Sequence, residues 1–362
     1  MKAVVLTGFG HADQVLRYET QHPKPQRKAG EVLVEVHVAS VNGGDSRVRM
    51  GWLPKGMVKI PQILGCDVAG VVLEADANSK FKPGDRVVAD TGQAVSDPWG
   101  THAEFVSCPE SRFAALPASV SFEAGAALPV AGLTAWQALK GSMPLAGKRV
   151  LVLGGAGGVG HLAVQIAKSQ GAYVAATCSS RNVEFVTKQL GADLAIDYTK
   201  GQKLEEAAGG AGSYDLVVDL VGDEPSAWGV LRRRGGRMAA VSFDGILQGK
   251  TGGALLLGIL VRALRCKLAA ALGLCPRYDI ITQQQHGPGM GLEEVVGLVA
   301  SGQVVPHIER VVSLAQVAEA HKHVETGRAR GRVVVRVAEA DDAAPARAAS
   351  AAAAAVAPAV AG

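Results

Sequence analysis

The sequence predicts an α/β protein in which an antiparallel, barrel-like β domain accompanies a doubly wound parallel-sheet domain. Up to about residue 125 the chain consists of short β-branched runs broken by Gly and Pro, such as KAVVLTG, EVLVEVHVASVN and GDRVVAD. This pattern is typical of an antiparallel β domain. From residue 126 apolar strands alternate with longer helical stretches. Such alternation predicts a parallel sheet covered by helices on both faces.

The end of the chain predicts how the two domains are connected. After about residue 304 the short strands return, as HIERVVSL and RGRVVVRV. We therefore expect residues 1–125 and 305–337 to form one domain and residues 126–304 the other. Residues 338–362 are almost wholly Ala, with Asp, Pro and a little Arg, and we expect a disordered tail there. A marginal helix is the alternative, because Ala has the highest helix propensity.

Composition excludes several classes of function. A chain of 362 residues with 48% apolar and 19% charged residues has enough material for a sizeable core. The formal net charge is only +4, and no run of five Lys or Arg occurs, so no nucleic-acid partner is expected. The five cysteines are far apart and form no CxxC pair, which favours a reducing compartment.

The N-terminus carries an expectation about location. Met1 runs directly into the strand-like KAVVL, with neither a basic-then-apolar signal nor an Arg/Ser-rich amphipathic leader. We expect a cytoplasmic protein. A chloroplast or a mitochondrion, reached without a recognisable cleavable leader, is the alternative.

The strongest chemical signal is RVLVLGGAGGVGHLAVQIAK, residues 149–168. An apolar strand leads into Gly155-x-Gly157-x-x-Gly160, and a helical pattern follows at once. Glycines here permit a tight turn and a close approach of the backbone, so that a pyrophosphate can bind at the helix N-terminus. The segment predicts a dinucleotide site. A glycine-rich turn of purely structural use is the alternative.

The end of the next strand indicates which dinucleotide is bound. An NAD enzyme has Asp or Glu there, against the ribose 2′-hydroxyl. Here AYVAATC ends in Ser179, Ser180 and Arg181, and two hydroxyls with a guanidinium suit a 2′-phosphate. We therefore predict NADPH as the cofactor. The alternative is that Ser180 caps a helix while Arg181 is solvated.

The most apolar stretch is GGALLLGILVRALRCKLAAALGLC, residues 252–275, which we expect to form a helical insertion. Arg262, Arg265 and Lys267 interrupt it, leaving no uncharged run of the ~18 residues that a membrane span requires. Two interpretations remain. The helix packs over the cleft or against a second subunit, or it lies on a membrane surface.

Together the motifs resemble the zinc-free quinone oxidoreductase and enone oxidoreductase branch of the medium-chain dehydrogenase/reductase superfamily, reticulon-4-interacting-protein-like members included. The matching blocks cover nearly all of residues 1–337 and include ASVNGGDSRVRMG, PQILGCDVAGVV, AALPVAGLTAWQAL, GGAGGVGHLAVQIAK and FVTKQLGADLAIDY. The resemblance implies a GroES-like antiparallel β-barrel catalytic domain, a Rossmann domain and a homodimer.

The resemblance also implies site residues. Asn42 and Asp45 would line the floor of the substrate cleft, with Trp52 beside them; both Asn42 and Asp45 are also good turn residues. The implied cofactor-binding residues, together with those from the motifs above, are Thr134, Gly155, Gly157, Gly158, Val159, Gly160, Ser179, Ser180, Arg181, Tyr198, Val221, Gly222, Val241, Ser242 and Phe243.

No metal ligand set is recognisable. The zinc-dependent relatives have a Cys in the first cleft block, Gly-His-Glu in the second and a lobe with four cysteines, whereas this chain has Asn42-Gly43, Gly65-Cys66-Asp67 and no lobe. Cys66 with Asp67 as a metal pair is the alternative to a buried thiol beside a hydrogen-bonded carboxylate. We predict that no metal is bound.

The predicted function is therefore hydride transfer from NADPH to a small quinone or α,β-unsaturated carbonyl, with no metal. The proton donor is open, because a Tyr expected in the block around Trp52 is missing; Tyr278 is a conceivable substitute, or a merely packed ring. The alternatives are a catalytically weak dinucleotide-binding scaffold, a membrane-surface partner protein, and a zinc-free alcohol or sugar dehydrogenase.

Overall fold

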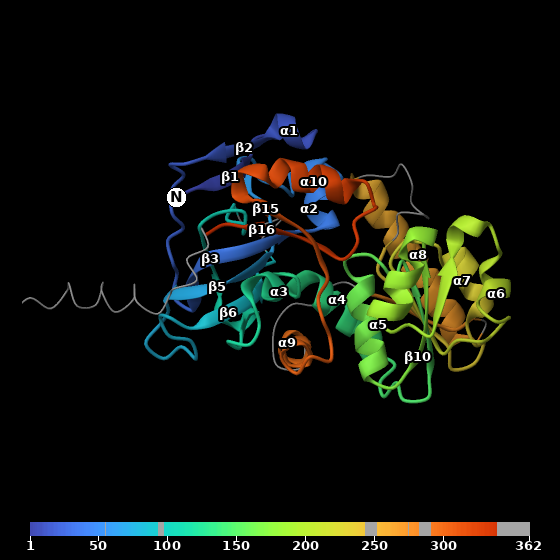
Figure 1. Ribbon diagram of the computed structural model, residues 1–362. Helices are drawn as coiled ribbons and strands as arrows, with labels where there is room; N and C mark the ends of the chain where they lie inside the picture. The colour runs from blue at the N-terminus through green and yellow to red at the C-terminus, as the bar shows by residue number, and fades with distance from the viewer. Residues whose placement is uncertain (55, 93–97, 243–251, 274, 282–290, 339–362) are drawn as a thin grey trace, which may run out of the picture.

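The computed structural model describes the chain except for residues 55, 93–97, 243–251, 274, 282–290 and 339–362. Two sheet-based halves lie side by side, with the chain's first and last described segments in the same half (Figure 1). Phe243, and the predicted tail apart from Ala338, lie outside the described residues.

The first half contains an antiparallel sheet to which the end of the chain contributes. Its strand order is β15-β16-β3-β5-β6-β8, and β7 also pairs with β3. Only β15 and β16 run parallel to each other. These strands are β3 (Glu31–Val41), β5 (Asp67–Glu74), β6 (Arg86–Asp90), β7 (Phe105–Pro109), β8 (Phe113–Ala115), β15 (Ile308–Ser313) and β16 (Arg332–Arg336).

A small three-stranded sheet and short helices complete this half. The sheet has the order β2-β1-β4, formed by Leu16–Glu19, Ala3–Leu6 and Gln62–Ile63. The helices are α1 (Ala12–Val15), α2 (Gly43–Arg49), α3 (Phe122–Ala126) and α10 (Val317–Glu325), with 3₁₀ turns at Glu110–Arg112 and Leu314–Gln316.

The second half is a six-stranded, wholly parallel sheet in the order β11-β10-β9-β12-β13-β14. Its strands read as continuous apolar runs because helices cover both faces. They are β9 (Arg149–Leu153), β10 (Tyr173–Cys178), β11 (Leu194–Asp197), β12 (Leu216–Asp219), β13 (Arg237–Ala240) and β14 (Arg277–Ile280). The strand order reverses between β9 and β12, where ligands bind in sheets of this type.

The helices of the second half are α4 (Pro129–Lys140), α5 (Gly160–Ser169), α6 (Leu204–Ala207), α7 (Glu224–Val230) and α8 (Gly252–Ala271), with a π-helical turn at Phe185–Gln189 and 3₁₀ turns at Ser180–Asn182 and Tyr198–Lys200. Helix α9 (Leu292–Ala300) packs on α4 and on β8 of the first half. None of the helices that the structure describes combines the length and hydropathy required to cross a bilayer. With both sheets as expected, the predicted fold class is confirmed.

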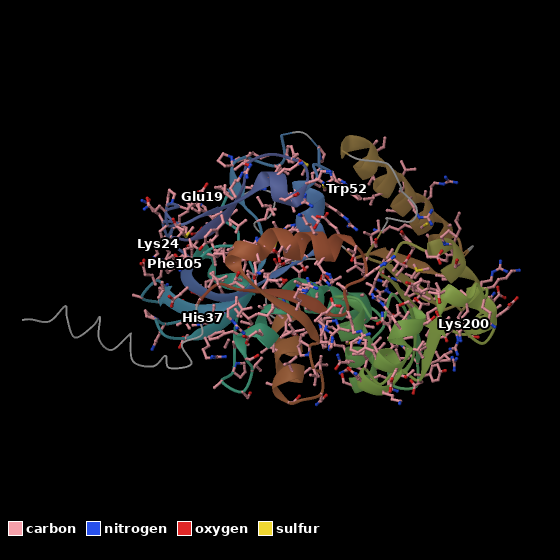
Figure 2. The ribbon with its side chains drawn as sticks, turned by 45° about the horizontal axis from the view of Figure 1, so that its top comes forward. Glu19, Lys24, His37, Trp52, Phe105 and Lys200 are labelled. Atoms are coloured by element: carbon pink, nitrogen blue, oxygen red, sulfur yellow. The ribbon has the colours of Figure 1, made fainter. Side chains whose placement is uncertain are left out.

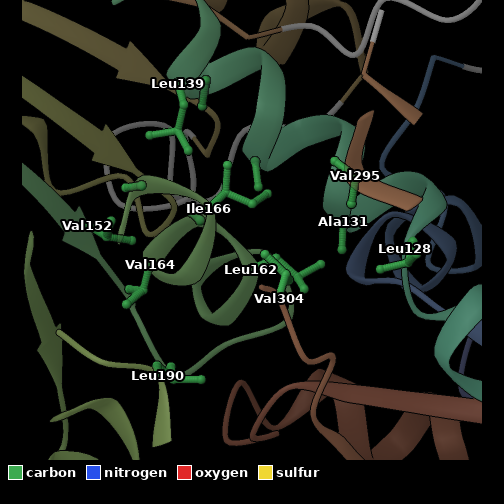
Figure 3. Close-up of a cluster of buried hydrophobic side chains, with 14 of the residues drawn as sticks. Leu128, Ala131, Leu139, Val152, Leu162, Val164, Ile166, Leu190, Val295 and Val304 are labelled. Carbon is green, nitrogen blue, oxygen red and sulfur yellow. The ribbon is translucent and has the colours of Figure 1, made fainter. Parts of the chain in front are cut away.

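One cluster of buried side chains joins the two halves. It runs from Val38 on β3 through α4 and α5 to Val152 on β9. Figure 3 shows its centre, where Ala131 of α4 lies near Val295 of α9 and Leu162 of α5 lies near Val304. Because protein interiors are close-packed, this shared core fixes the orientation of the two sheets. The loops of both sheets therefore meet in a defined geometry.

Candidate cofactor-binding and active site

The glycine turn lies between β9 and α5, as predicted from the sequence. Thr177 of the neighbouring strand holds it: the amide of Gly154 donates to the Thr177 hydroxyl and that of Gly155 to the Thr177 carbonyl, each at 2.9 Å. A Cβ on Gly155 would lie 2.6 Å from the Cβ of Ala176, and one on Gly160 would lie 2.1 Å from the Gly154 carbonyl oxygen. Only glycine fits at these two positions.

The amides at the start of α5 are available to an anion. Those of Gly158, Val159 and Gly160 donate no hydrogen bond among the residues that the structure describes. Nearby, burial lowers the pKa of His161 to about 3, so its imidazole is neutral and its Nδ1 faces the Gly157 carbonyl at 3.0 Å. Free amides and the helix dipole together form an anion-binding site.

The residues predicted to hold a 2′-phosphate lie together, with a carboxylate that the sequence analysis did not consider. Ser180 donates to Asp197 Oδ2 at 2.6 Å and lies 2.8 Å from the Thr199 hydroxyl. Asp197 ends β11, and the parallel register brings it opposite Cys178 at the end of β10. Hydrogen bonds from Ser180 and Thr199 lower the pKa of Asp197, so this carboxyl is charged at neutral pH.

The Ser180 cap interpretation is wrong. Ser179, not Ser180, is the N-cap residue of the Ser180–Asn182 turn, and no side-chain cap bond forms there. Arg181 donates to the Arg328 carbonyl. Tyr198 follows Asp197 and is 63% exposed.

A second arginine belongs to this corner. Arg330, just before β16, donates from Nε to Asn182 Oδ1 at 3.0 Å and from Nη2 to the Arg181 carbonyl at 3.3 Å. Its guanidinium also lies 5.1 Å from the centre of the Phe185 ring. Arg330 was not predicted from the sequence, because it lies about 150 residues away in the chain, although its basic GRARGR context was a usable signal.

The predicted residues of the nicotinamide side surround the end of β12. Asp219 Oδ1 accepts the amides of Val221 at 3.0 Å and Gly222 at 2.8 Å, and its carbonyl accepts those of Val241 and Ser242. A Cβ on Gly154 would lie 2.9 Å from Val221 Cγ1, so this loop adjoins the glycine turn. Thr134 is buried on α4, where its hydroxyl donates to the Val130 carbonyl at 2.6 Å.

A buried polar network lies directly under the glycine turn. Arg332 of β16 donates to Asp67 of β5 at 2.6 Å and to Asn42 Oδ1 at 2.9 Å, and it also reaches the Ser40 hydroxyl. Asn42 Nδ2 donates to Asp67 at 2.9 Å. The Arg332 side chain is 5% exposed and that of Asp67 is fully buried.

This network touches both halves of the molecule. The guanidinium of Arg332 would lie 3.3 Å from a Cβ on Gly158, and the amide of Gly331 donates to the Ala156 carbonyl at 2.9 Å. Asp67 also accepts the Val130 amide in the first turn of α4 at 2.7 Å, where a negative charge is favoured. Arg332 and Ser40 were missed by the sequence analysis, although an arginine inside the apolar run GRVVVRV was a signal.

Asn42 and Asp45 lie in contact, but their side chains have different hydrogen-bond partners. Asp45 is buried, and its side chain accepts a hydrogen bond from the backbone amide of Asn42 at 2.8 Å. This bond caps the start of α2. Burial raises the pKa of Asp45 to about 7, although the hydrogen bond from the Asn42 amide lowers it. A structural role at the turn before α2 accounts for this contact of Asp45. Asn42 retains a second amide hydrogen, because an Asn side chain carries two.

Trp52 and Tyr278 lie in different surroundings. Trp52 is 36% exposed, with the Arg47 guanidinium 5.8 Å from its ring, and its carbonyl accepts the Gly252 amide at 2.8 Å. It lies on the side of the first half that faces α8, far from Lys200 (Figure 2). Tyr278 is 1% exposed and stacks on Trp228, so its ring packs in the core, as the second interpretation had it.

The fold and the site define an oxidoreductase with two sheet domains, and the chain belongs to the quinone oxidoreductase and alkenal/one reductase branch of the medium-chain dehydrogenase/reductase superfamily. Residues 28–118 match the alcohol dehydrogenase GroES-like domain, and residues 190–335 match the family described as zinc-binding dehydrogenase. The predicted family is confirmed.

Three relatives illustrate the similarity. The chain is 35% identical to NAD(P)H oxidoreductase RTN4IP1, mitochondrial, of Danio rerio, over 94% of this chain and 92% of the relative. It is 34% identical to the NADPH-dependent alkenal/one oxidoreductase, chloroplastic, of Arabidopsis thaliana, over 92% and 79%. The structure of the quinone oxidoreductase from Coxiella burnetii superimposes with a TM-score of 0.77 at 30% identity, covering 93% and 99% of the two chains.

The name of one matched family implies zinc, and the donor set of this chain does not fit it. Within the described part of the chain, no three His, Cys, Asp or Glu side chains lie close enough together to hold a metal ion. Asp67 is already bonded by Arg332, Ser40 and Asn42. A catalytic zinc needs about three protein ligands around an open position. These contacts fit a hydrogen-bonded Asp67 side chain better than a metal site formed by Asp67 and Cys66.

Proposed function

We propose that this protein is an NADPH-dependent reductase that delivers a hydride to a quinone or an α,β-unsaturated carbonyl without a metal. The observation that carries the proposal is the row of amides at Gly158, Val159 and Gly160, which donate no hydrogen bond within the described protein; Gly158 also adjoins the buried Arg332. A pyrophosphate would satisfy those amides. The relatives' names, which cite NAD(P)H, NADPH, quinones and alkenals, support the same reaction class.

The preference for NADPH is supported by the cations near Ser180. Arg181 and Arg330 lie within one hydrogen-bonded group, and Lys200 follows in the adjoining turn. The charge of Asp197 opposes a phosphate, but hydrogen bonds from Ser180 and Thr199 occupy its oxygens. Because the two guanidinium groups outnumber the one carboxylate, whose oxygens are already hydrogen-bonded, the group favours binding of the 2′-phosphate. A preference for NADPH over NADH is tested separately from the use of either cofactor.

In the active site the protein's own task is to orient the acceptor and hold its oxygen. The bound cofactor supplies the hydride. The hydride adds to the conjugated acceptor, and the new negative charge moves onto an oxygen that hydrogen-bond donors stabilise and that water then protonates. We assign the second amide hydrogen of Asn42 to that oxygen, because Arg332 and Asp67 fix the other polar atoms of this side chain. Asp45 then supports Asn42, and the indole of Trp52 bounds the acceptor.

The first test is absorbance at the nicotinamide band with a panel of four compounds. A quinone, an alkenal and a saturated aldehyde are tested as hydride acceptors with NADPH or NADH, and an alcohol is tested as a hydride donor with the oxidised cofactors. We expect consumption of NADPH with the quinone or the alkenal. Turnover of the alcohol or the saturated aldehyde alone would instead support a zinc-free alcohol or sugar dehydrogenase. Cofactor binding with no turnover would support the scaffold function. Adding a chelator is expected to leave the rate unchanged.

The cofactor preference is tested by Arg181→Ala. We expect the KM for NADPH to rise by roughly tenfold, because one charge-assisted contact is lost, while the KM for NADH stays unchanged. Lys188→Ala is the matched control, since Lys188 is an exposed cation that pairs only with Glu184, at 2.7 Å, among the described contacts. Equal effects of Arg181→Ala on both cofactors would contradict the assignment. The predicted homodimer and cytoplasmic location stay predictions.

A further inference from the structure

We infer that the exposed face of α8 is a docking surface for an anionic lipid membrane. The helix and the residue that follows it present to solvent a stripe of six large aliphatic side chains, each between 47% and 73% exposed: Leu257, Leu260, Val261, Leu264 and Leu268 on α8, and Leu272 directly after it. An aliphatic stripe of this length is unusual on a protein surface that meets only water. The inference concerns binding and does not depend on the proposed reaction.

The positions of these residues form one continuous face. At 3.6 residues per turn they fall within about 60° of a common direction along the helix. Cys266 points the opposite way and packs on the buried cluster that contains Tyr278. The start of the helix is fixed by the bond from the Gly252 amide to the Trp52 carbonyl. The aliphatic stripe therefore faces outward because the other face is anchored.

The charges on α8 complement an anionic surface. Residues 252–271 contain three cations and no Asp or Glu. Arg265 and Lys267 are exposed, and helical geometry puts them roughly 70–90° to either side of the stripe. Cations on both borders of an apolar face suit a helix that lies in the headgroup region, with its leucines at the acyl boundary and its cations at the phosphates.

The same charges argue against a second copy of this chain on the stripe. Two such helices in contact would bring like-charged rows together with no acidic side chain on either helix to compensate. An anionic surface therefore fits the stripe and its bordering cations better than a second copy of the same helix does.

The test is cosedimentation of the full chain with vesicles, without cofactor or acceptor. Vesicles of phosphatidylcholine alone are compared with vesicles of equal parts phosphatidylcholine and phosphatidylserine, at low and at high salt. We expect binding to the mixed vesicles only, weakened by salt. The double variant Leu264→Gln/Leu268→Gln is expected to reduce the partition coefficient at least roughly tenfold, because buried aliphatic area is lost. Gln keeps the helix propensity of Leu nearly unchanged.

A second pair of variants separates charge from folding. Arg265→Gln/Lys267→Gln is expected to reduce partitioning roughly tenfold through lost phosphate contacts. Arg17→Gln/Lys82→Gln, which removes two exposed cations from the other half, and Val305→Gln, which removes an exposed aliphatic side chain, are expected to bind like the wild type.

Three results would overturn the inference. The first is a wild-type chain that stays in the supernatant with mixed vesicles, and the second is equal loss of binding in the Arg17→Gln/Lys82→Gln control. The third is a dimer, measured by light scattering without vesicles, that Leu264→Gln/Leu268→Gln dissociates; a second copy would then occupy the stripe.

Discussion

Arg332 and Asp67, which are 265 positions apart in the chain, form a buried ion pair with 2.6 Å between guanidinium and carboxylate. They lie on β16 and β5, the two strands that flank β3, and Ser40 of β3 hydrogen-bonds to both. The pair supports Asn42 and adjoins Gly158 of the glycine turn. One arginine thus connects the candidate acceptor site with the candidate cofactor site.

Removing one member of this pair should strongly destabilise the fold. Arg332→Met leaves the buried Asp67 side chain without its ion-pair partner, and we expect the free energy of unfolding to fall by about 3–5 kcal/mol. Urea denaturation measures this. Arg336→Met is the control on the same strand, because Arg336 makes an exposed ion pair with Glu123 and should cost less than about 1 kcal/mol. Similar losses in the two variants would refute the structural importance of the pair.

The glycines of the turn should differ in what their replacement affects. Gly160→Ala puts a Cβ 2.1 Å from the Gly154 carbonyl, so both stability and cofactor binding should be lost. Gly157→Ala puts a Cβ 3.5 Å from the same carbonyl oxygen, which is an ordinary van der Waals contact, so the melting temperature should stay unchanged. Any effect of Gly157→Ala should appear in the Kd for NADPH alone. Thermal unfolding and cofactor titration of both variants check this. A Gly157→Ala variant that melts early would contradict the geometry.

Asp45 should make stability fall as pH rises from about 4 to 7. Burial raises its pKa from 3.8 to about 7, with Asp67 adding to the rise and Arg332 opposing it. Between these values the folded chain holds a proton that the unfolded chain has released. The free energy of unfolding therefore decreases with pH, by up to about 4 kcal/mol over the window.

The variant Asp45→Asn tests this pH dependence. Its side-chain oxygen still accepts the hydrogen bond from the Asn42 backbone amide, but the new side chain does not titrate. Buried histidines with lowered pKa, such as His102 at about 4, act in the opposite direction, so the variant and the wild type are compared at each pH. We expect Asp45→Asn to gain stability relative to the wild type as pH rises from 4 to 7. A constant difference over this range would show that Asp45 does not titrate there.

The carboxylate of Asp197 should weaken the preference for NADPH. Asp197→Asn removes one negative charge beside Ser180 while retaining an acceptor for its hydroxyl. At an effective dielectric constant of about 20, a like charge within several ångströms costs a few kcal/mol at most, so a gain of roughly tenfold in NADPH affinity is reasonable. Affinity for NADH should change little. Fluorescence titration with both cofactors measures the ratio, and an unchanged ratio would exclude Asp197 from the phosphate environment.

Local patterns determined much of this protein. Alternating β-branched runs and the strand–glycine–helix order predicted both sheets and the turn at Gly155–Gly160, because hydrophobic periodicity and glycine's freedom act over a few residues. The position of Ser179–Arg181 after β10 was also readable, since the strand end fixes it. Family blocks extended this to Asn42 and Val221.

Tertiary structure alone decided which distant charges meet. The register of β16, β3 and β5 brings Arg332, Ser40 and Asp67 together, and that of β10 and β11 puts Asp197 beside Ser180. Strand pairing carries no signal in the local sequence, so a single chain does not reveal it. The same holds for α8: its composition showed an apolar helix with cations, but only packing on Tyr278 and Trp52 decided that the leucines face solvent, because burial depends on what lies opposite.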